Sequence, residues 1–363
     1  MTSPNHTAST LASPVGAALN PPTGVATAAP ADRRRRVFGL GAGLLGTLLV
    51  LGGTVLLSLA VGNKYVPLTE VWASLTGSGA GYADAVVNSR IPRTVLGVLA
   101  GASLAVAGAV MQGVTRNPLA DPGLFGVNAG AAAALVTAAA FFGLGSAATS
   151  VWVALPGAFF AVVIVYLVGA GGGRATPVRL VLAGVVVTAV IGAYIQAVTL
   201  SLPAVFDTYR FWVVGSLAGR DPGVILEVLP FVVAGLLLAL GLGPSLNALA
   251  LGDDTARALG AHVARTRLLG AFATTLLCAA ATAAVGPIGF VGLAVPHIMR
   301  AVVGSDQRWL LVYCLLGGPI LLLLADVLGR IIMSPAELMV GIVTAFIGAP
   351  ILLLAVRRLK STA

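Results

Sequence analysis

The chain has 363 residues, of which 58% are apolar or aromatic and 9% are charged, whereas an ordinary soluble domain carries about 25% charged residues. Such a composition cannot be enclosed in one core beneath a polar surface, so the sequence predicts a polytopic membrane protein. Two cysteines exclude a disulfide-rich fold, and three histidines are too few for a multi-histidine metal or haem site, so we expect no metal or cofactor. The net charge of +9 does not indicate nucleic acid, because no basic patch is interleaved with aromatic residues.

The first predicted element is a membrane span that follows a polar leader. Residues 1–32 are rich in Ala, Pro, Thr, Ser and Asn, and Arg33 to Arg36 directly precede an apolar run from Val37 to Val61. A run of this length crosses the roughly 30 Å hydrocarbon layer, and the arginines before it favour a cytoplasmic N-terminus. We expect residues 1–36 to form a disordered cytoplasmic leader and residues 37–360 to form one membrane domain.

Charges and Pro/Gly clusters divide the apolar sequence into ten predicted spans, which makes the fold all-α. The spans cover residues 37–61, 92–113, 124–143, 150–171, 178–200, 224–243, 266–285, 288–303, 309–332 and 336–356. An even number places both termini in the cytoplasm, and that side then holds fifteen of the 21 basic residues. Spans two and seven both lead through Pro-containing turns, which raises an inverted repeat of two halves as a further prediction.

The segment from Asn88 to Gly130 carries the densest pattern. Gly97, Gly101, Ala105 and Gly108 place small residues three and four positions apart, so a neighbouring helix can approach closely. A polar turn with prolines at positions 118 and 122 follows. Two interpretations are open: the pattern reflects close helix packing followed by an ordinary loop, or it has a functional role.

Several motifs in chain order resemble the membrane permeases of binding-protein-dependent iron-chelate and vitamin B12 ABC importers. They are R-x-P-R, G-A-x-L-A-x-A-G and Q-G-x-x-R-N-P-L-A-D-P between residues 90 and 122, then FWVVGS at 211–216, LALGDDTARALG at 249–260, GPIGFVGLAVPHIMR at 286–300, and ADVLGR through ELMVGIVTAFIGAP at 325–350. The resemblance covers everything after about residue 40. It implies a ten-span permease subunit that works as a homodimer or with a homologue, two cytoplasmic ATPases and an external binding protein.

The acidic and lysine residues agree with an external energy source. The only lysines, Lys64 and Lys360, do not close a phosphate-binding loop, so ATP cannot be hydrolysed on this chain. Asp326 is the one carboxylate placed within a span, and it lies four residues before Arg330, which favours an ion pair over a proton relay. Glu337 in S-P-A-E is typical of a capping box that starts a helix.

The resemblance assigns two contact sites. Arg90 and Arg93 open the second span and Arg330 closes the ninth, so all three are expected to reach the outer surface and to receive glutamates of the binding protein, with helix-end anchoring as the alternative. A cytoplasmic segment at about 244–265 corresponds to the helices that contact the ATPase. Its coupling residues are Gly252, Asp253, Asp254, Ala256, Arg257, Leu259 and Gly260.

The coupling segment also has a pattern of its own. Asp253 and Asp254 favour a helix start, Arg257 can pair with Asp253, Ala256 and Leu259 supply an apolar contact, and Gly260 ends the turn. A solvated surface helix remains the alternative. Polar or turn residues that could line or gate a pathway are Asn117, Leu119, Asn128, Thr176, Gln196, Thr199 and Thr344, although each could equally form interhelical hydrogen bonds.

The sequence thus predicts an inner-membrane permease subunit without catalytic residues. Its expected cargo is a ferric siderophore or related iron chelate, with vitamin B12 or haem as the alternative within the same family. An ion-coupled secondary carrier and an intramembrane enzyme are the rival classes. Few buried acids and no nucleophile–base pair argue against them.

Overall fold

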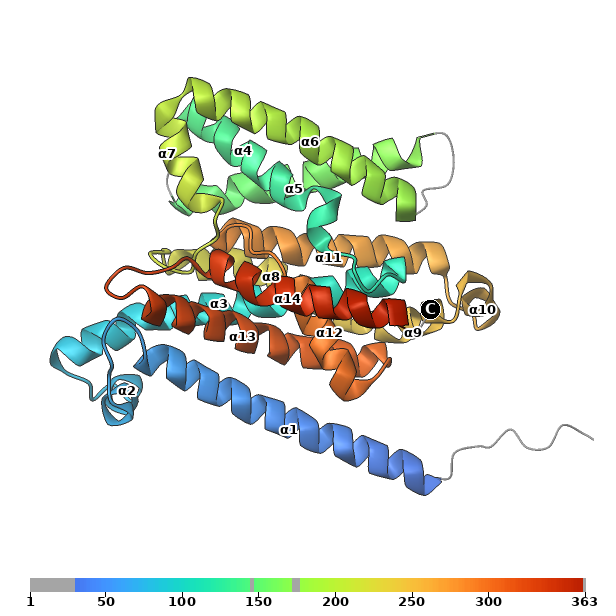
Figure 1. Cartoon of the computed structure of the whole chain (residues 1–363), viewed down its shortest axis with the longest axis horizontal. Helices are drawn as coiled ribbons and strands as arrows, with labels where there is room; N and C mark the ends of the chain where they lie inside the picture. Colours follow the sequence, from blue (N-terminus) through green and yellow to red (C-terminus); the bar gives the residue numbers. More distant parts are fainter. Residues whose placement is uncertain (1–29, 144–146, 172–176, 362–363) are drawn as a thin grey trace, which may run out of the picture. The chain divides into compact units, whose positions relative to one another are not determined.

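The computed structural model describes residues 30–143, 147–171 and 177–361. In this part of the chain every regular element is a helix. The chain divides into two compact units, residues 1–42 and 43–363. The first contributes the start of α1 (Pro30–Ala60), and the second holds the other helices, which are coloured in chain order in Figure 1.

Seven of the described helices are long and apolar enough to cross a membrane. They are α1, α3 (Gly81–Thr115), α5 (Ala147–Ala170), α6 (Pro177–Ser201), α8 (Gly223–Gly241), α11 (Val263–Val285) and α13 (Gln307–Ile332). Three further helices have shorter apolar stretches: α4 (Val127–Phe142), α12 (Val291–Val303) and α14 (Val340–Ser361), in which the stretch runs from Val340 to Leu353. These helices lie at the ten predicted spans, so the sequence-based division is confirmed at the level of elements.

Short helices occupy the two ends of the unit formed by residues 43–363. Figure 1 shows α2 (Leu68–Leu75) and α7 (Pro203–Trp212) at one end, here called the α2 end, and α9 (Gly243–Ala250) and α10 (Asp253–Ala258) at the other, here called the α10 end. A 3-10 turn, η1 (Pro122–Phe125), connects α3 to α4.

Helix α3 is the centre of the packed unit, with α8, α11, α12 and α13 around it. Small residues allow these contacts: a methyl group at Gly101 would lie 2.6 Å from the backbone nitrogen of Pro319, and one at Gly108 would overlap the backbone of Gly292. The close helix approach predicted from the spacing of small residues in α3 is confirmed. Cys278 and Cys314 are unpaired and buried, as expected for small apolar side chains.

One predicted helix start is wrong. Helix α14 begins at Val340, three residues beyond the proposed capping-box glutamate Glu337, and residues 337–339 have no regular structure. The side chain of Glu337 is instead engaged by an arginine of α3. A tertiary ion pair has replaced the local capping bond. The inverted repeat of two halves stays a prediction.

Candidate functional site

Two arginines at the α2 end hold the C-terminus of α1. Arg90 of α3 donates from Nη1 to the carbonyl of Leu59 and from Nη2 to that of Lys64, both at 2.7 Å. Arg330 of α13 donates from Nη1 to the carbonyls of Ser58 and Val61, at 2.8 and 3.2 Å. The last carbonyls of a helix have no intrahelical donors and carry partial negative charge, so these guanidinium groups cap α1.

A single buried carboxylate joins α3 to α13. Asp326 accepts from Arg93 Nε and Nη2, with Nη2 at 2.7 Å, and from Arg330 Nε at 3.0 Å. Its side chain is 1% exposed. The predicted pair between Asp326 and Arg330 is therefore confirmed. The second arginine could not be read from spacing, because Arg93 lies 233 positions away in the sequence.

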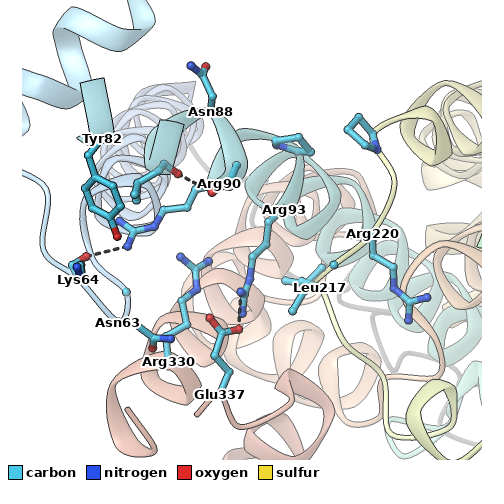
Figure 2. Close-up of a pocket in the computed structure, with 17 residues that line it drawn as sticks. Asn63, Lys64, Tyr82, Asn88, Arg90, Arg93, Leu217, Arg220, Arg330 and Glu337 are labelled. Atoms are coloured by element: carbon cyan, nitrogen blue, oxygen red, sulfur yellow. Dashed lines mark hydrogen bonds and ion pairs between the residues drawn. The ribbon is translucent and has the colours of Figure 1, made fainter. Parts of the chain in front are cut away.

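The third nitrogen of Arg93 reaches a second acid. Nη1 donates to Oε2 of Glu337 at 2.6 Å, and Figure 2 shows the two side chains pointing toward each other. Glu337 is about one-third exposed, whereas Asp326 is buried. Arg93 thus has one buried partner and one partly exposed partner.

These side chains border a cavity of about 620 Å³, here called the arginine pocket. Its lining combines residues after α1, the start of α3, the segment before α8 and the segment after α13 (Figure 2). Five basic side chains and one acidic side chain line it: Lys64, Arg90, Arg93, Arg220, Arg330 and Glu337. The excess of positive charge makes the pocket suited to a partner that brings carboxylates.

Two of the three predicted docking arginines are buried in the structure. Arg330 is 1% exposed and Arg90 is 8% exposed. The prediction that Arg330 reaches the surface is wrong, because Asp326 and the end of α1 surround its guanidinium. Arg93 faces the pocket with Glu337 at its outer side. Sequence reasoning missed Glu337 and Arg220 as pocket residues; the only available signal was their place in loops at the same predicted face.

At the α10 end, an aspartate links three helices. Asp253 of α10 forms ion pairs with Arg116 after α3 and with Arg267 of α11, at 3.1 and 3.0 Å. Arg116 adopts a left-handed backbone conformation with φ of 53°. The expected pair between Arg257 and Asp253 is wrong: Arg257 pairs with Asp254 at 2.7 Å, and that aspartate is fully exposed.

The apolar residues of α10 divide between the interior and the surface. Ala256 is completely buried against Leu249 and Val263, whereas Leu259 is 64% exposed. Leu259 is therefore accessible for the predicted apolar contact, whereas the side chain of Ala256 is enclosed by its own chain. Glycines in positive-φ conformations, Gly252 at 103° and Gly260 at 80°, bound the helix. The two glycines allow the turns at either end of α10, and the segment presents Leu259 at the surface.

The predicted pathway residues that the structure describes differ in burial, and some are enclosed within the subunit. Thr199 and Thr344 are buried, and their hydroxyls donate to carbonyls of their own helix, at Ile195 and Gly341. They do not line an open route within this subunit. Asn128 is half-buried, and its Oδ1 accepts from Thr282 at 2.8 Å, an interhelical bond between α4 and α11.

Three further pathway candidates are exposed. Gln196 is exposed on α6. Asn117 and Leu119 are exposed in the turn after α3, where Asn117 Oδ1 accepts from the backbone nitrogen of Leu119 at 3.0 Å. Thr176 lies outside the described residues. Leu119 is thus a described residue at the α10 end with an apolar side chain available to a gate.

The chain matches the FecCD transport family over residues 48–358. It is 49% identical over 316 residues to the ferric enterobactin transport system permease protein FepD of Escherichia coli (strain K12), a match that covers 86% of this chain and 94% of that protein. It is 43% identical over 269 residues to the Fe(3+)-citrate import system permease protein YfmD of Bacillus subtilis (strain 168), covering 74% and 80% of the two chains.

A solved structure agrees with these sequence relatives. One chain of a metal-chelate type ABC transporter, in an inward-facing conformation, superposes with a TM-score of 0.76 and 30% sequence identity. The superposition covers 88% of this chain and 99% of the other. The similarity therefore extends over nearly all of the described helices.

Proposed function

The chain belongs to the FecCD transport family and is a multi-pass membrane permease component of an ABC importer, and on this premise we propose that it passes a ferric siderophore into the cytoplasm. The observation that carries the cargo is the 49% identity with a ferric enterobactin permease over 94% of that protein. No lysine of the chain closes a phosphate-binding loop, so ATP hydrolysis on a partner drives the transport.

Three kinds of partner complete the importer: a second permease subunit, two cytoplasmic ATP-binding subunits and an extracytoplasmic binding protein. Arg33 to Arg36 in the first turns of α1, and Arg357, Arg358 and Lys360 in the last turns of α14, support a cytoplasmic location for both termini. With that orientation the α10 end faces the cytoplasm and the arginine pocket faces outward.

The coupling role of α10 is supported by its construction. The ion pairs of Asp253 tie α10 to the ends of α3 and α11, the two helices that pack most extensively at the centre of the unit. A force applied to Leu259 is therefore transmitted to these two helices. ATP-driven movement of the partner would change which side of the pathway is open.

The docking role of the arginine pocket is supported by charge. Arg93 keeps Asp326 on its inner side and can exchange Glu337 on its outer side for a carboxylate of the binding protein. Arg90 and Arg330 contribute by fixing the end of α1 and the wall of the pocket. Docking then adds charge-assisted hydrogen bonds without reorganising the buried part of the network.

Reconstituted transport tests the proposal. The permease is assembled in proteoliposomes with its ATPase, and the binding protein is supplied outside with ferric enterobactin, ferric citrate, haemin or vitamin B12. We expect ATP-dependent, vanadate-sensitive uptake of a ferric siderophore. Uptake of haemin or vitamin B12 alone would overturn the cargo, and uptake driven by an ion gradient without ATP would overturn the coupling to an ATPase. Haemin is included because the hemin transport system permease protein HmuU of Yersinia pestis is 36% identical over 319 residues.

A further inference from the structure

One guanidinium of the arginine pocket has both Nη groups without a hydrogen-bond partner among the described residues. Arg220 donates from Nε to the carbonyl of Ser216 at 3.1 Å, but within the described ranges no acceptor lies at hydrogen-bond distance from its two Nη atoms. The adjacent acid does not supply one, because Asp221 Oδ1 accepts from the backbone nitrogen of Gly223 at 2.6 Å. Arg220 therefore brings an uncompensated positive charge to the cavity wall.

The other four cations of the pocket are all engaged within the chain. Arg90 and Arg330 bind the carbonyls at the end of α1, and Arg93 binds two carboxylates. The ammonium of Lys64 lies 4.8 Å from the ring centre of Tyr82. Arg220 differs from these four residues because its two Nη groups remain available to an acceptor from outside the chain.

Burial makes the lack of a partner costly. Arg220 is partly buried, and this burial lowers the pKa of its guanidinium. A charge removed from water without a counter-ion destabilises the state that contains it, and a binding carboxylate would offset that cost. Two features of the site, an unpaired cation and a cavity beside it, thus favour an anionic group from outside the chain.

The segment that carries Arg220 is fixed in place. The backbone nitrogen of Ser216 donates to the carbonyl of Val285 at 2.8 Å, and the carbonyl of Gly215 accepts from Gly341 at 3.2 Å. Leu217 is buried beneath the same turn. These contacts join the segment to the end of α11 and the start of α14, so the guanidinium is preorganised and loses little freedom on binding.

We infer that Arg220 is a separate docking contact that binds one acidic side chain of the extracytoplasmic binding protein. In Figure 2 its guanidinium lies apart from Arg93 and Glu337 and points away from them, so a carboxylate on Arg93 does not also satisfy Arg220. The planar fork of arginine binds a carboxylate through two parallel hydrogen bonds. The inference rests on the proposed docking at this pocket and adds a second acidic residue to the partner's surface.

The first test measures the affinity of the chelate-loaded binding protein for the complete permease–ATPase complex in lipid nanodiscs. We expect Arg220→Gln to weaken binding roughly tenfold to hundredfold at low salt, because a charge-assisted contact is lost. Arg210→Gln is the matched control: it removes the same charge from α7 at the same end, but Arg210 already pairs with Asp207 and does not line the pocket. Its affinity should equal that of wild type.

A second variant keeps the test valid if Arg220→Gln perturbs the fold. Arg220→Cys supplies a thiol in a chain whose two native cysteines are buried. We expect the loaded binding protein to protect this thiol from maleimide, whereas the ferric chelate alone should not. Protection by the chelate alone would show that the anion is the cargo and would overturn the inference.

Arg93→Gln distinguishes a failure of the role inferred for Arg220 from a failure of the proposed docking at the arginine pocket. If Arg93→Gln weakens docking while Arg220→Gln matches wild type, the pocket receives the binding protein and the role of Arg220 is wrong. If neither variant changes the affinity and the thiol is not protected, the proposed docking at this pocket fails altogether.

Discussion

The two ends of the helical unit use the same residue types in opposite ways. At the α2 end, Arg90, Arg93 and Arg330 are buried or half-buried and bind backbone carbonyls or the shared carboxylate of Asp326. At the α10 end, the ion pairs of Asp253 and Asp254 are more exposed, and Leu259 projects into solvent. The carboxylate of Asp326 is thus withdrawn from water, whereas the aspartates of α10 are partly or fully exposed.

This difference predicts how each end binds a partner. A half-buried cationic pocket attracts acidic groups, and its outer contacts weaken as salt rises. The exposed side chain of Leu259 would bind a partner by burying apolar surface, an interaction that salt does not screen. Variants at the two ends should therefore differ in their effect on stability and in the salt dependence of partner binding. The side chains that bind the partner should be charged at the α2 end and apolar at the α10 end.

The largest effect is expected at the buried carboxylate. Asp326→Asn leaves Arg93 and Arg330 without their common anion, and breaking such a network costs about 3–5 kcal/mol. Thermal unfolding of the purified permease should show this loss. Asp207→Asn is the control, since it removes an exposed pair with Arg210 that is worth about 0–1 kcal/mol. Equal unfolding temperatures for the two variants would mean that the Asp326 network does not stabilise the α2 end.

The next effect concerns the two apolar residues of α10. Leu259→Glu should leave the permease folded but weaken ATPase binding by about 2 kcal/mol, as expected for a central contact residue. Ala256→Glu should instead lower the unfolding temperature, because it places a charge against Leu249 and Val263. Co-purification of the ATPase at low and high salt measures the contact. Full retention by Leu259→Glu would remove α10 from the coupling interface.

A smaller effect is expected at the turn between α3 and η1. Leu119→Trp adds bulk to an exposed side chain at the α10 end, and it should slow uptake about tenfold, which corresponds to about 1.4 kcal/mol, without preventing assembly. Leu200→Trp, on the exposed end of α6, is the control and should transport normally. Normal uptake by the Leu119 variant would exclude this turn from the gate.

The elements of the fold were predictable because the bilayer sets the length of each apolar run. Hydropathy located seven apolar helices long enough to cross a membrane and three shorter ones, and the small residues of α3 indicated its close contacts with Gly292 and Pro319. The predicted pair of Asp326 with Arg330 was also correct, because residues four apart share a helix face. Local periodicity is sufficient for relationships of this kind.

The composition of the candidate site was less predictable because its contacts are non-local. Glu337 fits a capping box, yet a partner 244 positions away in sequence engages its carboxylate. Burial of Ala256 and exposure of Leu259 depend on how α10 folds back on Leu249, which spacing within a six-residue helix does not determine. An outward location in the topology likewise could not show that Arg330 is enclosed.

The smallest effect tests whether Glu337 competes with the partner. Docking on Arg93 requires the incoming carboxylate to replace Glu337, so Glu337→Gln should raise the affinity for the binding protein about two- to fivefold at low salt, the value of a partly exposed ion pair. The gain should vanish at high salt, where the original pair is screened. Glu70→Gln, an exposed acid of α2 that does not line the pocket, controls for the general change of charge. A lower affinity for Glu337→Gln but not for Glu70→Gln would show that Glu337 positions Arg93 for docking, and the outer side of Arg93 would then be a fixed part of the pocket wall.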